Sequence, residues 1–262
     1  MKYFNAYSAI IILLLWTAIT LGPNVYALNG KTKELGEGLG NGLSYSIAGA
    51  ALFILLVTIL SGNLKITGLV LKNSQNLQIL YFQIVIILIV IAFLGYHFDV
   101  IKGNGIAWTF GNCLLVGISE EMMFRGILLS AFTKSWGFRK AAFAVVVIFG
   151  SIHILNALTT GKLGEGFLQA FMAMCSGLLF LAYRVKNLTI FFAILLHAIW
   201  DFVVFLLSDT LKLIKVEENI ILNLCLELIL IASPIAFGMY GLYLLTRKKA
   251  SEDYLVSQNL NY

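Results

Sequence analysis

Long apolar stretches with almost no charge are the feature that most restricts how this chain folds. Several of them reach the roughly 17–25 residues that a helix needs to cross the hydrocarbon core of a bilayer. Only two prolines occur in the sequence, and 60% of its residues are hydrophobic while 12% are charged. A soluble domain carries about 25% charged residues. The pattern therefore predicts an all-α, polytopic membrane protein.

Short loops rich in glycine and asparagine separate the apolar stretches and predict about eight transmembrane helices. The expected spans are Tyr7 to Ala27, Leu43 to Leu60, Leu77 to Leu94, Ile106 to Phe132, Lys140 to Leu158, Gly166 to Tyr183, Leu188 to Leu207 and Ile220 to Leu245. We group them as three N-terminal helices in residues 1–105, a four-helix core in 106–207, and a last helix with a polar tail in 208–262. The first stretch also resembles a signal peptide, but a retained span is our preferred interpretation.

The distribution of basic residues predicts that both termini lie in the cytoplasm, because cytoplasmic loops carry an excess of lysine and arginine. With that threading, eleven of the 18 basic residues fall on the cytoplasmic side and six on the other. The net charge of +5 does not indicate nucleic-acid binding, since no basic face is interleaved with aromatic residues. Membrane lipids are the expected partners, and nothing in the sequence indicates an oligomeric state.

Several ionisable residues lie inside the predicted spans, where charge is costly and usually marks a functional site. They are Glu120, Glu121 and Arg125 in the fourth span, His153 in the fifth, His197 and Asp201 in the seventh, and Glu227 in the eighth. Two pairs have i, i+4 spacing, so that each pair shares a helix face. These are Glu121 with Arg125 and His197 with Asp201.

Antiparallel threading brings three of these side chains to one depth. At a rise of ~1.5 Å per residue, Glu120, His153 and His197 lie roughly 18, 20 and 16 Å from the same membrane surface. This coincidence predicts one shared site near the middle of the bilayer. Taken singly, the features have simpler interpretations. Glu121 and Arg125 form a structural ion pair, His153 is a satisfied core histidine, and His197 with Asp201 is a hydrogen-bonded pair.

Three motifs occur in order within about a hundred residues, 106–207. They are Glu-Glu-x-x-x-Arg at Glu120, Glu121 and Arg125, Phe-x-x-x-His at Phe149 and His153, and His-x-x-x-Asp at His197 and Asp201. Together they resemble the CPBP family of intramembrane proteases, also called Abi or CAAX-protease-like proteins. The third motif carries Asp where Asn is the alternative, and the family commonly allows this.

The resemblance implies a glutamate-dependent peptidase. It makes Glu120 the general base that activates water, with help from His153. His197 and Asp201 would hold the water or the oxyanion, while Glu121 and Arg125 would orient the helix. Two histidines and a glutamate also match zinc ligands. Two interpretations therefore stay open: no required cofactor, or zinc bound by Glu120, His153 and His197.

The expected function is an endopeptidase that cuts a membrane-associated or lipid-modified peptide or protein. The small size resembles the bacterial branch of the family, which implies a bacterial cell membrane and a role in peptide maturation, bacteriocin self-immunity or envelope regulation. One alternative is a non-catalytic immunity or scaffold protein. A second is a proton-coupled transporter, although we find no internal repeat of the kind that many transporters show.

Overall fold

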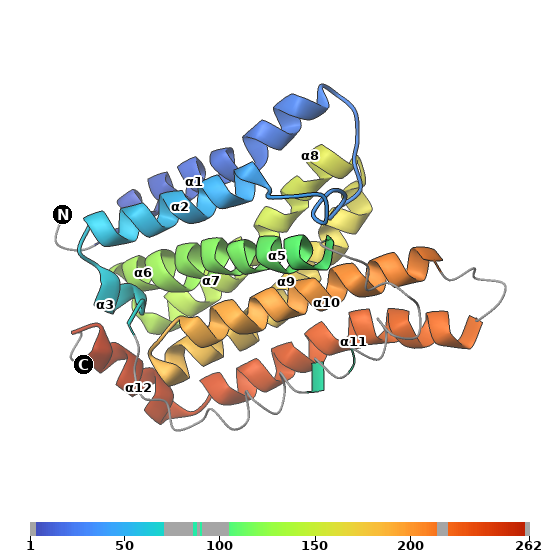
Figure 1. Cartoon of the computed structure of the whole chain (residues 1–262). Coiled ribbons are helices and arrows are strands. Elements are labelled where there is room, and N and C mark those ends of the chain that lie inside the picture. The colour runs from blue at the N-terminus through green and yellow to red at the C-terminus, as the bar shows by residue number, and fades with distance from the viewer. Residues whose placement is uncertain (1–3, 71–85, 88–89, 91–104, 214–219, 260–262) are drawn as a thin grey trace.

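The computed structural model describes residues 4–70, 86–87, 90, 105–213 and 220–259, and every element in them is helical (Figure 1). This outcome follows from the apolar sequence, because a helix satisfies all its backbone hydrogen bonds within one segment, as lipid requires. The elements are α1 (Ala6–Leu28), α2 (Tyr45–Leu60), α3 (Leu64–Thr67), α5 (Gly105–Glu121), the π-helix η1 (Met122–Leu128), α6 (Leu129–Trp136), α7 (Phe138–Ile152), the 3₁₀ helix η2 (His153–Asn156), α8 (Ala157–Thr160), α9 (Leu163–Asn187), α10 (Phe191–Leu213), α11 (Ile220–Leu245) and α12 (Lys248–Ser257).

Four helical stretches are long and apolar enough to cross a membrane, and each overlaps an expected span. They are Ala6–Leu28, Phe138–Thr160, Leu163–Asn187 and Glu227–Leu245. Two shorter apolar helices, Tyr45–Leu60 and Phe191–Leu206, overlap two further expected spans. The expected span Leu77 to Leu94 lies almost wholly outside the described residues. The all-α membrane architecture is thus confirmed, while the count of eight spans and the division into three parts stay predictions.

The expected span at 106–132 is not a simple α-helix. It is made of α5, η1 and α6 in direct succession, so a π-helical turn interrupts it immediately after Glu121. Its three charged residues also lower its apolar character, which explains why length and hydropathy alone do not mark it as a span. Such π-bulges are rare and often lie at functional sites.

Helix α9 lies at the centre of the bundle and contacts α7, α10, α11, α12 and η2, while α5 packs against α2 and α10. Small residues allow this close approach. A Cβ atom added at Gly117 would come within 2.7 Å of the Ile194 carbonyl oxygen on α10. One added at Gly150 would come within 2.6 Å of the Ala170 carbonyl oxygen on α9. These glycines bring the helices that carry the predicted site into contact.

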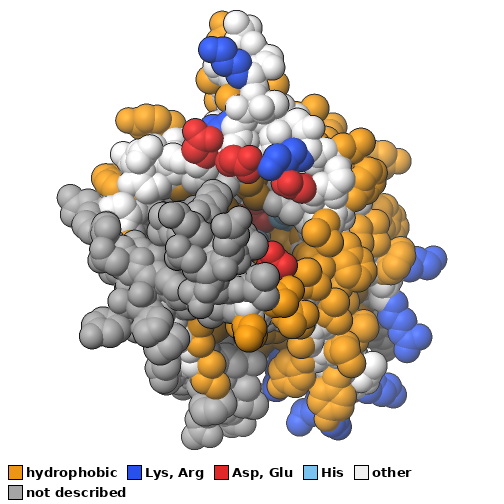
Figure 2. All heavy atoms as spheres, turned by 90° about the vertical axis from the view of Figure 1, so that its right-hand side faces the viewer, with side chains coloured by type: hydrophobic (Ala, Val, Ile, Leu, Met, Phe, Trp, Pro, Cys, Tyr) orange, Lys and Arg blue, Asp and Glu red, His pale blue; other side chains and the backbone are white. Residues whose placement is uncertain are grey.

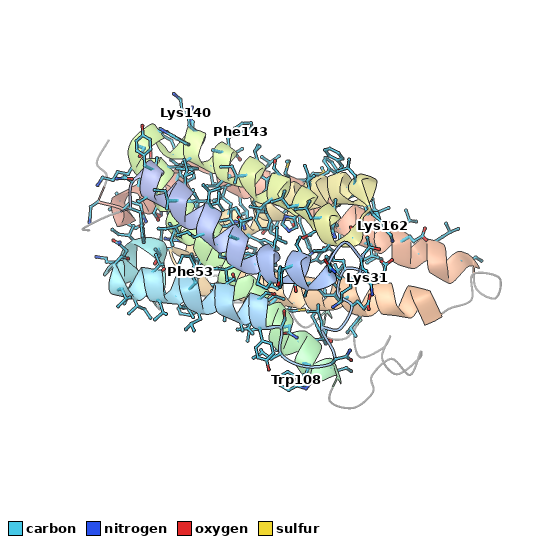
Figure 3. All side chains as sticks on the ribbon, turned by 90° about the horizontal axis from the view of Figure 1, so that it is seen from above. Lys31, Phe53, Trp108, Lys140, Phe143 and Lys162 are labelled. Atoms are coloured by element: carbon cyan, nitrogen blue, oxygen red, sulfur yellow. The ribbon has the colours of Figure 1, made fainter. Side chains whose placement is uncertain are left out.

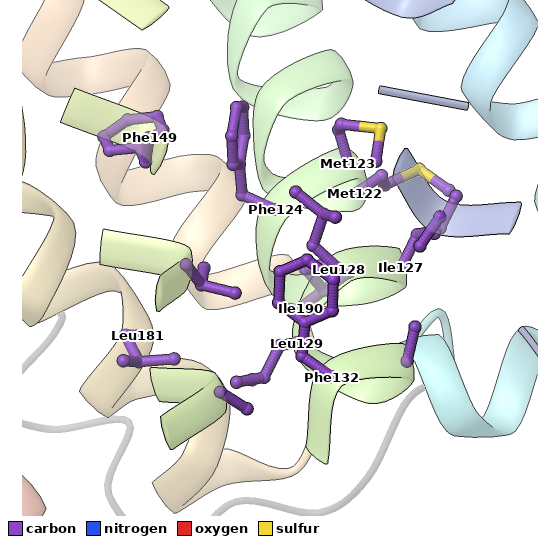
Figure 4. Packing of buried hydrophobic residues seen from close by; sticks show 14 of the residues in the cluster. Met122, Met123, Phe124, Ile127, Leu128, Leu129, Phe132, Phe149, Leu181 and Ile190 are labelled. Carbon is purple, nitrogen blue, oxygen red and sulfur yellow. The ribbon is translucent and has the colours of Figure 1, made fainter. Parts of the chain in front are cut away.

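The main cluster of buried apolar residues is centred on η1 and α6, toward the end of the bundle near α3 and α12, and a second cluster on α5 and α10 consists of Cys113, Ile199, Phe202 and Val203. Figure 4 shows the apolar packing of the main cluster, whose members include Phe124, Ile127, Leu128 and Phe132 of η1 and α6 and Leu181 of α9. All five are at most 1% exposed. Both described ends of the chain lie at this end of the bundle (Figure 1).

Candidate active site

Glu120 lies between two histidine rings that come from different helices. Its Oε2 atom is 3.9 Å from Nε2 of His153 and 3.8 Å from Nε2 of His197. Glu120 belongs to α5, His153 is the first residue of η2, and His197 lies on α10. The structure therefore brings together the three side chains that the sequence placed at one depth.

Hydrogen bonds on the opposite ring nitrogens fix how the two imidazoles face Glu120. Nδ1 of His153 is 2.8 Å from the carbonyl oxygen of Phe149. Because a carbonyl only accepts, this Nδ1 is the donor, and Nε2 of a neutral His153 ring is then an acceptor. Nδ1 of His197 is 2.7 Å from Oε1 of Glu121. Both Nε2 atoms consequently point toward the Glu120 carboxylate.

The Glu121 carboxylate binds a second side chain in addition to Arg125, its predicted partner. Its Oε1 atom accepts hydrogen bonds from Nη1 of Arg125, at 2.9 Å, and from Nδ1 of His197. Both Glu121 and Arg125 are completely buried. The contact predicted by the i, i+4 spacing is present, but the link to His197 was not predicted. Consecutive residues on a helix point about 100° apart, so a Glu-Glu pair between two helices indicates that each carboxylate faces a different neighbour.

Arg125 is held in place by groups on α7 and α9. Its Nη2 donates to the carbonyl oxygen of Gly177 at 3.1 Å, and its Cζ lies 3.9 Å from the ring centroid of Phe149. A Cβ atom at Gly177 would come within 2.8 Å of that Nη2. Phe149 belongs to a predicted motif, whereas nothing in the sequence singled out Gly177. Gly177 could have been identified in the sequence only as a small residue on the face of α9 that packs against the helix of Arg125.

Aromatic rings fix the plane of His197. Phe180 of α9 is stacked on the imidazole, with centroids 4.8 Å apart and an interplanar angle of 15°. Phe149 meets the same ring edge-on at 5.9 Å. Phe180 was missed by sequence reasoning, because one aromatic residue in an apolar helix carries no distinguishing pattern.

Asp201 completes the group of predicted residues. Its Oδ2 atom lies 3.5 Å from Nε2 of His197. The side chains of Glu120, His153 and Asp201 are 15%, 20% and 22% exposed, whereas that of His197 is 5% exposed. The site is therefore open on one side and closed around the rings by Phe149, Phe180 and Glu121.

The distances between the donor atoms of Glu120, His153 and His197 can be compared with those in a tetrahedral zinc site. Two ligands on a tetrahedral zinc ion lie about 3.4 Å apart, given metal–ligand distances near 2.1 Å. The N–O distances here are 3.8 and 3.9 Å. Among the described residues, no group of three or more His, Cys, Asp and Glu side chains has the arrangement of a metal site. As placed, the Glu120 carboxylate oxygen lies farther from each histidine Nε2 atom than two ligands of one tetrahedral zinc ion lie from each other.

Comparison with known proteins bears on the same segment. Residues 102–203 match the family described as type II CAAX prenyl endopeptidase Rce1-like. No curated protein and no solved structure gave a match. The matched residues include all three motifs and every residue of the site described above. The match supports an intramembrane endopeptidase of the CAAX type, and residues 102–203 are similar to the matched family.

Proposed function

We propose that this protein is an intramembrane endopeptidase in which Glu120 activates the water that hydrolyses a peptide bond. The observation that carries the proposal is the separation of Glu120 Oε2 from the two histidine Nε2 atoms. At 3.8 and 3.9 Å the groups are too far apart for direct hydrogen bonds. Polar groups at such distances are commonly bridged by water, and one water molecule between them would contact all three.

In the proposed attack, the water donates one hydrogen bond to Glu120 and the other to Nε2 of His153. Glu120 removes the first proton while the water oxygen bonds to the carbonyl carbon of the substrate. The carbonyl oxygen takes up the negative charge of the tetrahedral intermediate. When the C–N bond breaks, the protonated Glu120 returns its proton to the leaving amine. A positioned general base of this kind contributes roughly 10²–10⁴-fold to the rate.

His197 is the proposed donor to the oxyanion. It donates from Nε2 when its ring carries both protons, and Glu121 at Nδ1 and Asp201 near Nε2 are the carboxylates that balance that charge. The stack on Phe180 keeps the ring plane fixed. Preorganised donors of this kind are worth most in a site that excludes water. The substrate class that fits a site at this depth is a membrane-associated or lipid-modified peptide or protein.

The decisive test is Glu120→Gln, which keeps the size of the side chain and removes the base. Glu227→Gln is the matched control, because Glu227 is also a glutamate within an apolar helix but is exposed on α11. Peptidomics of membranes should show an uncut peptide that accumulates with Glu120→Gln and not with Glu227→Gln. Equal processing by the Glu120→Gln variant would instead support the scaffold alternative. Proton-dependent flux in reconstituted vesicles would support the transporter.

The metal-free mechanism makes a separate prediction. Cleavage by purified protein should be unchanged after prolonged treatment with a chelator, because Glu120 and the two histidines act on water directly. Metal analysis of the wild type and of His153→Ala should give the same background content. Loss of cleavage on chelation, restored by zinc, would contradict this mechanism.

A further inference from the structure

Helix α1 lies outside the segment that matches the endopeptidase family, 102–203, and it crosses one face of the bundle. Figure 3 looks onto this face and shows α1 between α2, which carries Phe53, and α7, which carries Phe143. Apolar side chains cover much of one flank of the bundle in Figure 2, as contact with lipid favours. The outer face of α1 follows the same pattern, with Ile11 and Leu14 exposed. Any effect of α1 on the site therefore comes from the side chains that it turns inward.

The buried face of α1 consists of Ala9, Leu13 and Trp16. All four tryptophans of the chain lie in the described residues, and Trp16, at 3% exposed, is the one that is buried. Its Nε1 donates a hydrogen bond of 2.7 Å to Oγ of Ser119 on α5, and Ser119 is buried as well. A buried indole N–H needs such a partner, because an unpaired donor in an apolar interior is costly. The bond joins α1 to the residue that immediately precedes Glu120.

Three consecutive residues of α5 contact three different sets of neighbours. Ser119 contacts α1, and Glu120 lies between the two histidine rings. Glu121 accepts hydrogen bonds from Arg125 and His197. Consecutive side chains point about 100° apart on a helix, so contacts on both sides of Glu120 fix the rotation of α5 about its axis. A carboxylate roughly 6 Å from that axis moves by about 1 Å when the helix rotates by about 10°.

The π-helix η1, which begins directly after the Glu-Glu pair, gives this contact additional weight. A π-turn departs from the regular i→i−4 hydrogen-bond ladder, so contacts with neighbouring helices have to fix the rotation of α5 at the site. Trp16 also packs on η1, where its ring meets Phe124 edge-on with centroids 5.5 Å apart. Phe124 meets Phe149 edge-on at 5.0 Å, and Phe149 meets the His153 ring at 5.0 Å. Trp16 is thus connected to Glu120 through Ser119 and to His153 through two phenylalanine rings.

We propose that Trp16 is a positioning residue for the reaction, and that its hydrogen bond to Ser119 sets the direction in which Glu120 points. The inference rests on the proposed function, in which Glu120 is the base, and it adds α1 to the parts of the chain that the chemistry needs. A misplacement of about 1 Å at a catalytic group can lower a rate by roughly 100-fold. Loss of the bond therefore acts on the chemical step and leaves substrate binding nearly as it was.

Trp16→Phe and Ser119→Ala each remove one side of the hydrogen bond. Trp16→Phe keeps an aromatic ring next to Phe124 and removes the N–H, while Ser119→Ala removes the acceptor. In the full chain, with a synthetic copy of the peptide that Glu120→Gln leaves uncut, each variant should lower kcat by about 10–100-fold with KM nearly unchanged. The double variant should lose no more than the weaker single variant, because both changes remove the same bond. Additive losses, or a raised KM with unchanged kcat, would overturn the proposal.

Leu13→Ala is the matched control for packing. Leu13 lies one turn before Trp16 on the buried face of α1 and belongs to the same apolar cluster. The substitution loosens the packing of α1 and removes no polar contact. It should lower the melting temperature in detergent and leave kcat per folded molecule at the wild-type value. A loss of kcat equal to that of Trp16→Phe would show that packing alone accounts for the effect, and would overturn the role given to the hydrogen bond.

Nuclear magnetic resonance measures the hydrogen bond without any cleavage. In the full chain labelled on the indole nitrogens, Trp16→Phe identifies the Trp16 signal among the four. Ser119→Ala should shift that signal and speed the exchange of its N–H with deuterium, and an unchanged signal would overturn the inference. The two proposals fail in different ways. Normal cleavage by Glu120→Gln would contradict the proposed function, whereas normal kcat in Trp16→Phe beside lost cleavage in Glu120→Gln would contradict the positioning role alone.

Discussion

At the scale of single residues, the site depends on one carboxylate that serves two partners. Oε1 of Glu121 accepts from both Arg125 and His197, and all three side chains are buried. Such a carboxylate–imidazole contact fixes the orientation of the ring and leaves its other nitrogen for chemistry. Glu121 is therefore both part of an ion pair and the residue that aims His197 at Glu120.

Glu121→Gln should separate these two roles. It leaves the Arg125 guanidinium buried without its carboxylate, and breaking such a buried pair costs about 3–5 kcal/mol. It also removes the charge beside His197, so cleavage should fall. In the double variant Glu121→Gln with Arg125→Met, thermal stability in detergent should recover while cleavage stays low. Recovery of both would show that Glu121 acts only on stability.

At the scale of elements, the close contact of α7 with α9 sets the position of His153. Gly150 lies one turn before this histidine, at a point where an added Cβ atom would clash with the Met174 side chain and the Ala170 carbonyl oxygen of α9. A small residue there allows the ring to reach Glu120. The chain then leaves the α-helical path at His153, where the short 3₁₀ helix η2 begins.

Gly150→Ala should force α7 away from α9, because the added Cβ would come within 2.6 Å of the Ala170 oxygen. Overpacking of this kind costs about 1–3 kcal/mol, and the shift of His153 should lower the cleavage rate as well. Gly111→Ala on α5 is the control, since its Cβ would meet nothing within 4 Å. That substitution should leave rate and melting temperature unchanged or raise the melting temperature. Equal effects of the two variants would contradict the role given to Gly150.

The sequence predicted those contacts of the site that depend on spacing within one helix or on the antiparallel order of the helices across the membrane. The i, i+4 contacts of Glu121 with Arg125 and of His197 with Asp201 are present because they depend on helix geometry alone. The meeting of three helices followed from their antiparallel order. The Glu121–His197 hydrogen bond and the stack on Phe180 depend on the rotation of each helix about its axis. An apolar sequence specifies that rotation weakly, because lipid and protein interior favour the same side chains.

At the scale of the whole molecule, the residues buried near α12 contribute to stability and lie away from the side chains proposed to carry out the chemistry. The half near the chain termini contains the fully buried residues of η1 and α6, whereas the side chains of Glu120, His153 and Asp201 in the site are 15–22% exposed. Helix α12 packs against α9 and α11 at the end of this half. Tyr254 is completely buried there, with its ring 5.6 Å from that of Phe138 and 5.2 Å from Cζ of Arg184.

Tyr254→Ala should therefore reduce stability without changing the chemistry. Loss of a large buried aromatic side chain costs about 3–5 kcal/mol, and the buried core of η1 and α6 separates Tyr254 from Glu120. The melting temperature in detergent should fall clearly, while the cleavage rate per folded molecule stays at the wild-type value. Tyr254→Phe keeps the ring against Arg184 and should retain most of the stability. If Tyr254→Ala lowered the rate of protein that is still folded, α12 would have to act on the site across the packed half, and the division between a stabilising half and a reactive half would be wrong.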